Sequence, residues 1–184
     1  MAPINAESFI LAGGDSSRFG RSKALHPIEG VPMILRIYRL LKAAFPEVTV
    51  VSKSPESYAK LNLPTLIDSF SFQAPLAGVL SALSIATSEW LFIVACDYPN
   101  LTLDFIHHLW NVRAGLGVIP VSQNRTHPLA AFYHQQCRPL FQSAYENGDY
   151  TLTQVIDSDR FRQVSGFDSH TLWNVNHPDD LIHL

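Results

Sequence analysis

The sequence has few cysteines, little net charge and no long apolar run, and each shortage excludes a class of protein. Its 184 residues include two cysteines, Cys96 and Cys137, too few for a disulfide framework, so we expect a reducing cytoplasm. No apolar run approaches the roughly 20 residues that span a bilayer, and the start MAPINAES has neither basic residues nor a sustained apolar segment. We therefore predict neither export nor membrane insertion.

The charge is nearly balanced. Lysine and arginine total 13 against 16 acidic residues, and the formal net charge of -3 at pH 7 argues against nucleic acid as the main partner. With 47% hydrophobic and 16% charged residues the chain is expected to be globular. Its length predicts one domain over residues 1–184 with a sizeable core, so any anion site must be local.

What the sequence does contain is a glycine-rich loop within residues 9–25, FILAGGDSSRFGRSKAL. A short apolar run ends at Gly13-Gly14, and hydroxyl and basic side chains follow, including Arg18 and Lys23. Glycines let backbone N–H groups approach an anion, and the basic side chains supply donors and positive charge. The spacing matches neither a Walker A loop nor the G-x-G-x-x-G dinucleotide fingerprint. We expect a phosphate-binding loop of another kind, with an ordinary strand-to-loop turn as the alternative.

The hydrophobic pattern predicts alternating strands and helices. Strands are expected at residues 9–11, 48–51, 65–67, 90–95, 117–121 and 129–133, and helices at 32–44, after Ser54-Pro55, at 75–86, at 102–110 and at 135–145, with a last short helix at Pro178. This order predicts an α/β, Rossmann-like three-layer sandwich with a mostly parallel central sheet and helices on both faces. Ligands of such sheets lie beyond the carboxyl ends of the strands, so the glycine-rich loop, Asp68 and Asp97 are expected to share one crevice. The strand order in the final third is not predicted.

Asp97 is the predicted metal ligand. It follows residues 90–95, the most apolar run in the chain, where an unpaired carboxylate would be costly without a cation or hydrogen bonds. A Mg²⁺ ion that accompanies a polyphosphate needs one or two carboxylates, although a cap on the turn before Pro99 is the alternative. Nucleotidyl transfer fits these parts: the loop holds the triphosphate, Lys23 spreads the charge on the leaving pyrophosphate, and the metal orients the α-phosphate. Lys23, Asp97 and Arg18 are thus the predicted catalytic residues, and an acceptor phosphate, already ionised, needs no general base.

Other polar positions have two interpretations each. Asp68 either faces the site or caps a turn. His127 either contacts an anionic substrate or is present only because the turn before Pro128 favours it. Asn174 and Asn176 lie on the same side of an extended segment, where they hydrogen-bond one ligand or cap the next helix.

Together these pieces resemble the molybdenum cofactor guanylyltransferases, nucleotidyltransferases with a Rossmann-like α/β fold. The matching motifs run in order over nearly the whole chain: LAGG with SSRFG and KAL at 11–25, Ile67-Asp68-Ser69, PLAG at 75–78, CDYP at 96–99, HPLAAFY at 127–133 and NVNHPDDL at 174–181. The resemblance implies that the GMP part of GTP is joined to the terminal phosphate of molybdopterin carrying molybdenum, with Mg²⁺ required and pyrophosphate released. Its partners would be the enzymes that receive the finished dinucleotide cofactor, or other cofactor-assembly proteins.

The resemblance also implies roles for single residues. Those that would contact the nucleotide or its metal are Leu11, Ala12, Gly13, Gly14, Lys23, Asp68, Gly78 and Asp97, with Asn174 and Asn176 toward the pterin. Two segments depart from the family pattern. Val51-Ser52-Lys53 stands where an asparagine is expected, so that contact is lost or made by Ser52. Asp149-Tyr150 stands where the family tends to place an arginine, and an acid is a poor neighbour for an anionic phosphate.

Two other functions stay open at this point. One is a cytidylyltransferase of the same cofactor or of a sugar or alcohol phosphate. The other is a nucleotide-binding regulatory module without turnover, which would show no activity to lose on substitution of Asp97 or Lys23.

Overall fold

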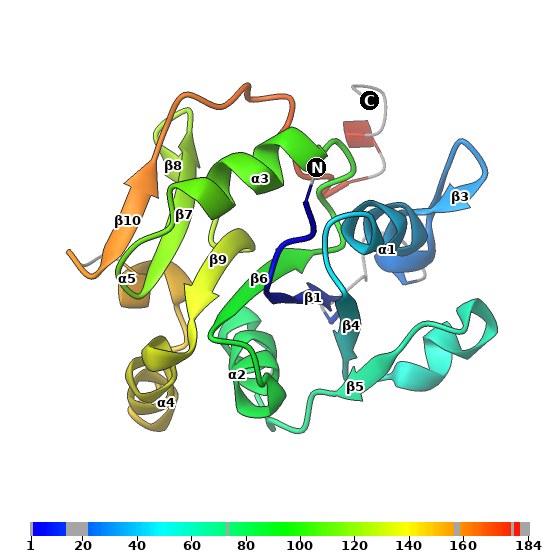
Figure 1. Cartoon of the computed structure of the whole chain (residues 1–184). Helices are drawn as coiled ribbons and strands as arrows, with labels where there is room; N and C mark the ends of the chain where they lie inside the picture. Colours follow the sequence, from blue (N-terminus) through cyan, green and yellow to red (C-terminus); the bar gives the residue numbers. More distant parts are fainter. Residues whose placement is uncertain (1, 14–21, 73, 157–158, 178, 181–184) are drawn as a thin grey trace.

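A mixed sheet forms the middle of the protein (Figure 1). The computed structural model describes residues 2–13, 22–72, 74–156, 159–177 and 179–180. Within them the strand order is β10 (Phe161–Val164), β7 (Gly117–Ser122), β9 (Ala130–His134), β6 (Trp90–Ala95), β1 (Glu7–Leu11), β4 (Glu47–Ser52) and β5 (Thr65–Ile67), with β8 (Arg125–Thr126) paired to β7. All neighbours in this row are parallel except those of β9, which runs antiparallel to β6 and β7.

Helices cover both faces of the sheet and make the three layers predicted from the sequence (Figure 1). The helices α1 (Met33–Lys42) and α3 (Leu103–Asn111) pack on one face, and α2 (Pro75–Ile85), α4 (Arg138–Glu146) and α5 (Leu152–Ile156) on the other. In β6, Phe92 and Val94 enter the first core while Leu91 and Ile93 enter the second. Because successive side chains alternate across a strand, an unbroken apolar run is buried on both sides.

The short elements follow local signals in the chain. A small hairpin, β2 (Pro27–Ile28) and β3 (Val31–Pro32), turns at Glu29 and Gly30, both with positive φ. Within the described residues, 3-10 helices include η2 (Lys23–Leu25), η3 (Pro55–Leu61) and η4 (Gln135–Cys137). Thr102 caps α3 as its position predicts, since its hydroxyl accepts the Phe105 N–H at 3.2 Å.

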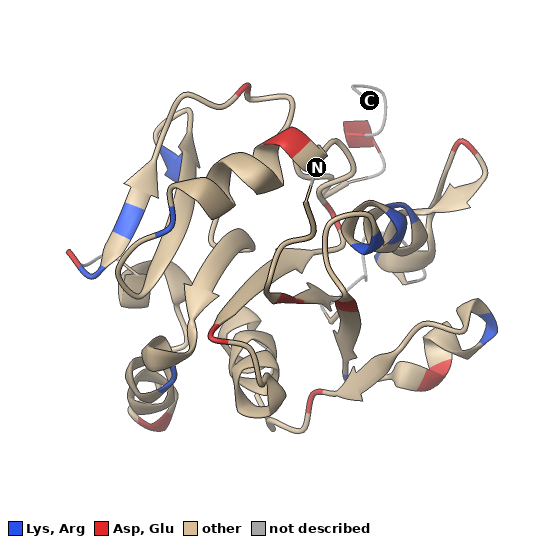
Figure 2. Cartoon of the chain, in the orientation of Figure 1, with Lys and Arg blue, Asp and Glu red and all other residues tan. Residues whose placement is uncertain are grey.

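The two faces of a helix differ from one helix to another. In α1, Ile34, Ile37 and Leu41 are buried while Arg39 and Lys42 are exposed, the amphipathic pattern predicted from the sequence. In α2, where an apolar stripe was expected, every residue from 76 to 83 is buried, because this helix packs between the sheet and α4. Figure 2 shows lysines and arginines interspersed with acidic residues on the elements around the sheet.

The predicted strands and helices are confirmed with shifts of a few residues at their ends, and the elements that were not predicted include β8, α5 and β10. The antiparallel direction of β9 follows from the β7–β8 hairpin, whose turn residues Gln123 and Asn124 both have positive φ and reverse the chain. The expected helix at Pro178 lies partly outside the described residues. None of the described helices is both long and apolar enough to cross a membrane.

Candidate functional site

A cavity of about 590 Å³ opens at the carboxyl ends of three adjacent strands, β4, β1 and β6. We call it the nucleotide cavity, after the ligand that the sequence predicts for this edge of the sheet. Leu11, the last residue of β1, is in register with Val51 of β4 and Ala95 of β6, so residues that follow these three positions meet at one edge. Its lining residues are Leu11, Ala12, Gly13, Ser22, Lys23, Ala24, Ser52, Lys53, Ser54, Ser57, Tyr58, Pro75, Ala95, Cys96, Asp97 and Leu129. Six of the predicted site residues are among them: Leu11, Ala12, Gly13, Lys23, Ser52 and Asp97.

Lys23 and Asp97 form an ion pair in this cavity. The Lys23 ammonium donates to Oδ2 of Asp97 at 2.9 Å, and both side chains are largely buried. The other carboxylate oxygen, Oδ1, is buried and has no hydrogen-bond partner among the described residues. A buried carboxylate oxygen without a partner is costly, so this atom is available to a ligand that supplies positive charge.

The donor set around Asp97 fits magnesium. Mg²⁺ prefers oxygen ligands and keeps several waters, so one carboxylate oxygen together with substrate phosphates is sufficient. No group of three or more histidine, cysteine and acidic residues in the described part of the chain could hold a metal by itself. A metal at this site would therefore depend on Oδ1 of Asp97 and on the bound nucleotide.

The backbone of Ala12 is fixed by hydrogen bonds from β4 and η3. The Ala12 carbonyl accepts from Tyr58 Oη at 2.9 Å and from Ser52 Oγ at 3.3 Å, while its N–H donates to Val51 at 2.9 Å. Burial is the main cause that raises the pKa of Tyr58 above its ordinary value, so this hydroxyl stays a donor. Ser52 thus helps to position the first residue after β1. Tyr58 was missed from the sequence, where it is one aromatic residue in a short helix.

Gly78, the glycine of PLAG, supports the cavity from behind. A Cβ at this position would lie 3.1 and 3.2 Å from the two methyl groups of Leu11. The absence of a side chain at residue 78 therefore leaves room for Leu11 of β1 against the first turn of α2, and a side chain here would require Leu11 to shift. Pro75 of the same motif lines the cavity directly.

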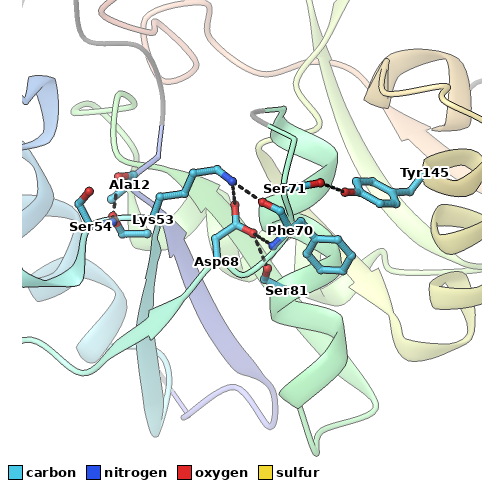
Figure 3. Close-up of polar contacts among 9 residues, drawn as sticks. Ala12, Lys53, Ser54, Asp68, Phe70, Ser71, Ser81 and Tyr145 are labelled. Carbon is cyan, nitrogen blue, oxygen red and sulfur yellow. Dashed lines mark hydrogen bonds and ion pairs between the residues drawn. The ribbon is translucent and has the colours of Figure 1, made fainter.

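Asp68 is held by its own surroundings at the end of β5 (Figure 3). Its Oδ1 accepts from Ser81 Oγ at 2.9 Å and from the Phe70 N–H at 3.2 Å. Its Oδ2 lies 3.8 Å from the Lys53 ammonium, which also donates to the Phe70 carbonyl. Asp68 is not among the residues that line the nucleotide cavity, whereas Lys53 is.

A second cavity, of about 380 Å³, contains the two asparagines of the NVN motif. Asn174 and Asn176 line it, and the Asn176 amide donates to Asn174 Oδ1 at 3.2 Å, so both amides lie on one side as predicted. Arg125 also lines it. The Val175 N–H between the asparagines donates to the Asp97 carbonyl at 2.9 Å. The second cavity is thereby tied to the segment that follows β6.

His127 also lines the second cavity and is neutral at physiological pH. Its Nε2 lies 2.8 Å from Ser122 Oγ and its Nδ1 lies 3.3 Å from Tyr98 Oη. Burial, followed by the charge of Arg125, lowers the pKa of His127 below its ordinary value. The ring therefore offers hydrogen bonds rather than charge to a ligand.

The remaining predicted positions lie elsewhere. Gly14 and Arg18 lie outside the described residues. Asp149, expected to disturb an acceptor phosphate, instead lines a different depression together with Asn147 and Arg160. Its neighbour Tyr150 stacks on Phe72 at 3.9 Å between ring centroids. Asp149 therefore lines neither the nucleotide cavity nor the second cavity.

Comparison with known proteins places the chain among nucleotidyltransferases. Residues 8–164 match the MobA-like NTP transferase domain. Proteins described as probable molybdenum cofactor guanylyltransferases are 30% identical in Aquifex aeolicus, over 94% of this chain and 87% of the relative, and 34% identical in Clostridium perfringens, over 89% and 83%. A crystal structure of a protein from Aquifex aeolicus superimposes with a TM-score of 0.82 at 27% identity, covering 94% of each chain. Molybdopterin-guanine dinucleotide biosynthesis protein A from Archaeoglobus fulgidus has the same fold, with a TM-score of 0.80 at 19% identity over 96% and 95% of the chains.

Proposed function

Because the chain belongs to the MobA-like NTP transferase family, we propose that it transfers the GMP part of GTP to the terminal phosphate of molybdopterin carrying molybdenum. The relatives from Aquifex aeolicus and Clostridium perfringens, described as probable molybdenum cofactor guanylyltransferases, support this choice of substrates. The observation that carries the proposal is the pairing of Lys23 with Asp97 inside the nucleotide cavity, with Oδ1 of Asp97 left for a cation.

The donor nucleotide would lie across the ends of β6, β1 and β4. The phosphates bind at Lys23 and Asp97, and the backbone at 11–13 supports the nucleoside. Asp97 would hold Mg²⁺, which supplies charge to the triphosphate and helps to align it. Lys23 neutralises the charge that develops on the β- and γ-phosphates as they leave. Asp68 does not line the cavity and would act on the nucleoside only through its ion pair with Lys53, which does.

The acceptor would enter through the second cavity. Its terminal phosphate meets Arg125 and the neutral His127, while Asn174 and Asn176 offer amides to the polar edge of the pterin. An acceptor phosphate oxygen attacks the α-phosphorus of GTP, a new P–O–P linkage forms, and the bond to the β-phosphate breaks with release of pyrophosphate. Since the attacking oxygen is already ionised, no residue has to remove a proton.

We further propose that the reaction takes place in the cytoplasm. Cys96 and Cys137 are both free and buried, which suits a reducing compartment. Enzymes that receive the dinucleotide cofactor, or other cofactor-assembly proteins, are then the expected partners.

The test is a screen of the four nucleoside triphosphates with Mg²⁺ and purified molybdenum cofactor, read by pyrophosphate release and by the mass of the product. The expected product carries one added GMP and forms with GTP alone. A product that carries CMP, with no use of GTP, would make the protein a cytidylyltransferase. Nucleotide binding without pyrophosphate release from any of the four would identify a binding module.

A further inference from the structure

Lys53 is a second lysine among the residues that line the nucleotide cavity. It follows the last residue of β4, whereas Asp97 follows β6, and β1 lies between these two strands. Two interstrand spacings separate the ends of β4 and β6 by about 10 Å. A nucleotide whose phosphates lie at Lys23 and Asp97 therefore places its base, rather than its phosphates, near Lys53.

The Lys53 ammonium has a hydrogen-bond donor to spare. An ammonium carries three N–H donors. The Phe70 carbonyl accepts one of them, and the Asp68 carboxylate lies 3.8 Å away as the ion-pair partner (Figure 3). The Lys53 side chain is 32% exposed. Within the described residues at least one N–H thus remains for a ligand in the cavity.

The surroundings hold this ammonium in one place. Ser81 and the Phe70 N–H fix Oδ1 of Asp68, so the carboxylate cannot rotate freely. The ring of Phe70 packs edge-on against Tyr145 at 4.9 Å between centroids, and the Tyr145 hydroxyl lies 3.4 Å from Ser71 Oγ (Figure 3). The segment that follows β5 is therefore anchored to α4. A donor held in this way loses less conformational entropy when it binds a ligand.

A fixed ammonium beside a fixed carboxylate is complementary to a base that presents a carbonyl oxygen rather than an amino group. Guanine presents the O6 acceptor, whereas adenine and cytosine present amino donors at the corresponding positions, N6 and N4. We propose that Lys53 donates a hydrogen bond to O6 of the guanine and so selects GTP over ATP and CTP, an inference that rests on the proposed function. An amino group at the same place would meet the ammonium donor to donor, which is repulsive. The Val51-Ser52-Lys53 segment lacks the asparagine of the family pattern, and Lys53 would recognise the base in its place.

The experiment compares Lys53→Met with Lys60→Met, a matched change of an exposed lysine on η3. Calorimetry measures the affinity for GTP and for 2-aminopurine riboside triphosphate, which lacks O6 but keeps the N2 amine. The wild type should bind GTP roughly 10-fold more tightly than the analogue, the worth of one hydrogen bond from a charged donor. Lys53→Met should lose this preference because its affinity for GTP falls while its affinity for the analogue does not. Lys53→Arg should recover part of the preference, and Lys60→Met should leave it unchanged.

Equal weakening of GTP and the analogue in Lys53→Met would overturn the inference, because the lysine would then not read O6. If Lys53→Met does not fold, the wild type still decides: equal affinity for the two nucleotides also overturns it. Failure of the proposed function is distinguished by turnover. A wild type that releases pyrophosphate from CTP but not from GTP contradicts the guanylyltransferase itself, whereas one that uses GTP without a preference for O6 contradicts only the role of Lys53.

Discussion

Lys23 and Asp97 are 74 residues apart in the chain, and their side chains lie 2.9 Å apart within the nucleotide cavity. One comes from the end of the glycine-rich loop and the other from the segment after β6. The phosphates of a nucleotide would compete with Asp97 for the ammonium, while a metal would bind the carboxylate. The pair thus holds both groups in position before the substrate arrives, as electrostatic catalysis requires.

We predict that Asp97→Asn abolishes turnover without unfolding the protein. The amide keeps the size of the side chain but lacks the negative charge that a metal needs at Oδ1. Pyrophosphate release from GTP should fall by roughly 10³-fold, while the backbone bond from Val175 to residue 97 is retained. The melting temperature should stay close to that of the wild type. Activity within 10-fold of the wild type would show that Asp97 does not hold the metal.

Lys23→Met should impair the chemical step through loss of charge at the leaving group. Methionine keeps most of the aliphatic stem, so the cavity wall is preserved. We expect kcat to fall by roughly 10²-fold or more, together with weaker binding of GTP. Steady-state kinetics with Lys42→Met, a change on the exposed side of α1, as the control would measure both. An unchanged kcat with a raised KM would limit Lys23 to binding.

Gly78→Ala should weaken nucleotide binding more than it weakens the fold. The new Cβ would lie 3.1 Å from a Leu11 methyl group, and the Leu11 side chain, which lines the cavity, would have to shift by a few tenths of an ångström to make room. The free energy of unfolding should change by about 1 kcal/mol, while the Kd for GTP rises several-fold. Ser84→Ala, on an exposed position of the same helix, is the matched control. A fall in stability with normal GTP affinity would show that a displaced Leu11 does not disturb the nucleotide cavity.

Stability should decrease at alkaline pH because of the buried thiols. Burial raises the pKa of Cys137 from 9.0 to about 12. In the unfolded chain this thiol ionises near its ordinary value, whereas in the folded protein it stays protonated, so the stability present below pH 9 is lost as the pH rises from 9 toward 12. The free energy of unfolding should fall by up to about 1.4 kcal/mol per pH unit for this group. Urea titrations of the wild type and Cys137→Ala under reducing conditions would measure it, and a difference between them that does not change with pH would contradict the assignment.

The departures from the family pattern show where sequence reasoning stopped. Asp149 stood out as an acid near the acceptor, but the chain after α4 carries it to another depression, beside Arg160. Lys53 stood out only as a missing asparagine, although it lines the nucleotide cavity and pairs with Asp68. Both outcomes depend on how segments distant in the sequence pack together, and no local pattern contains that information.

The sequence by itself determined the alternation of strands and helices and the apolar course of β6, since hydrophobic periodicity acts over a few residues. It also placed Asp97 at the end of a buried strand. Only the tertiary structure decided that Lys23 reaches Asp97, that Tyr58 supports Ala12 and that β9 runs antiparallel. Those relationships arise when strands distant in sequence align in one sheet, because the spacing and register of the strands, not the order of residues, fix which side chains meet.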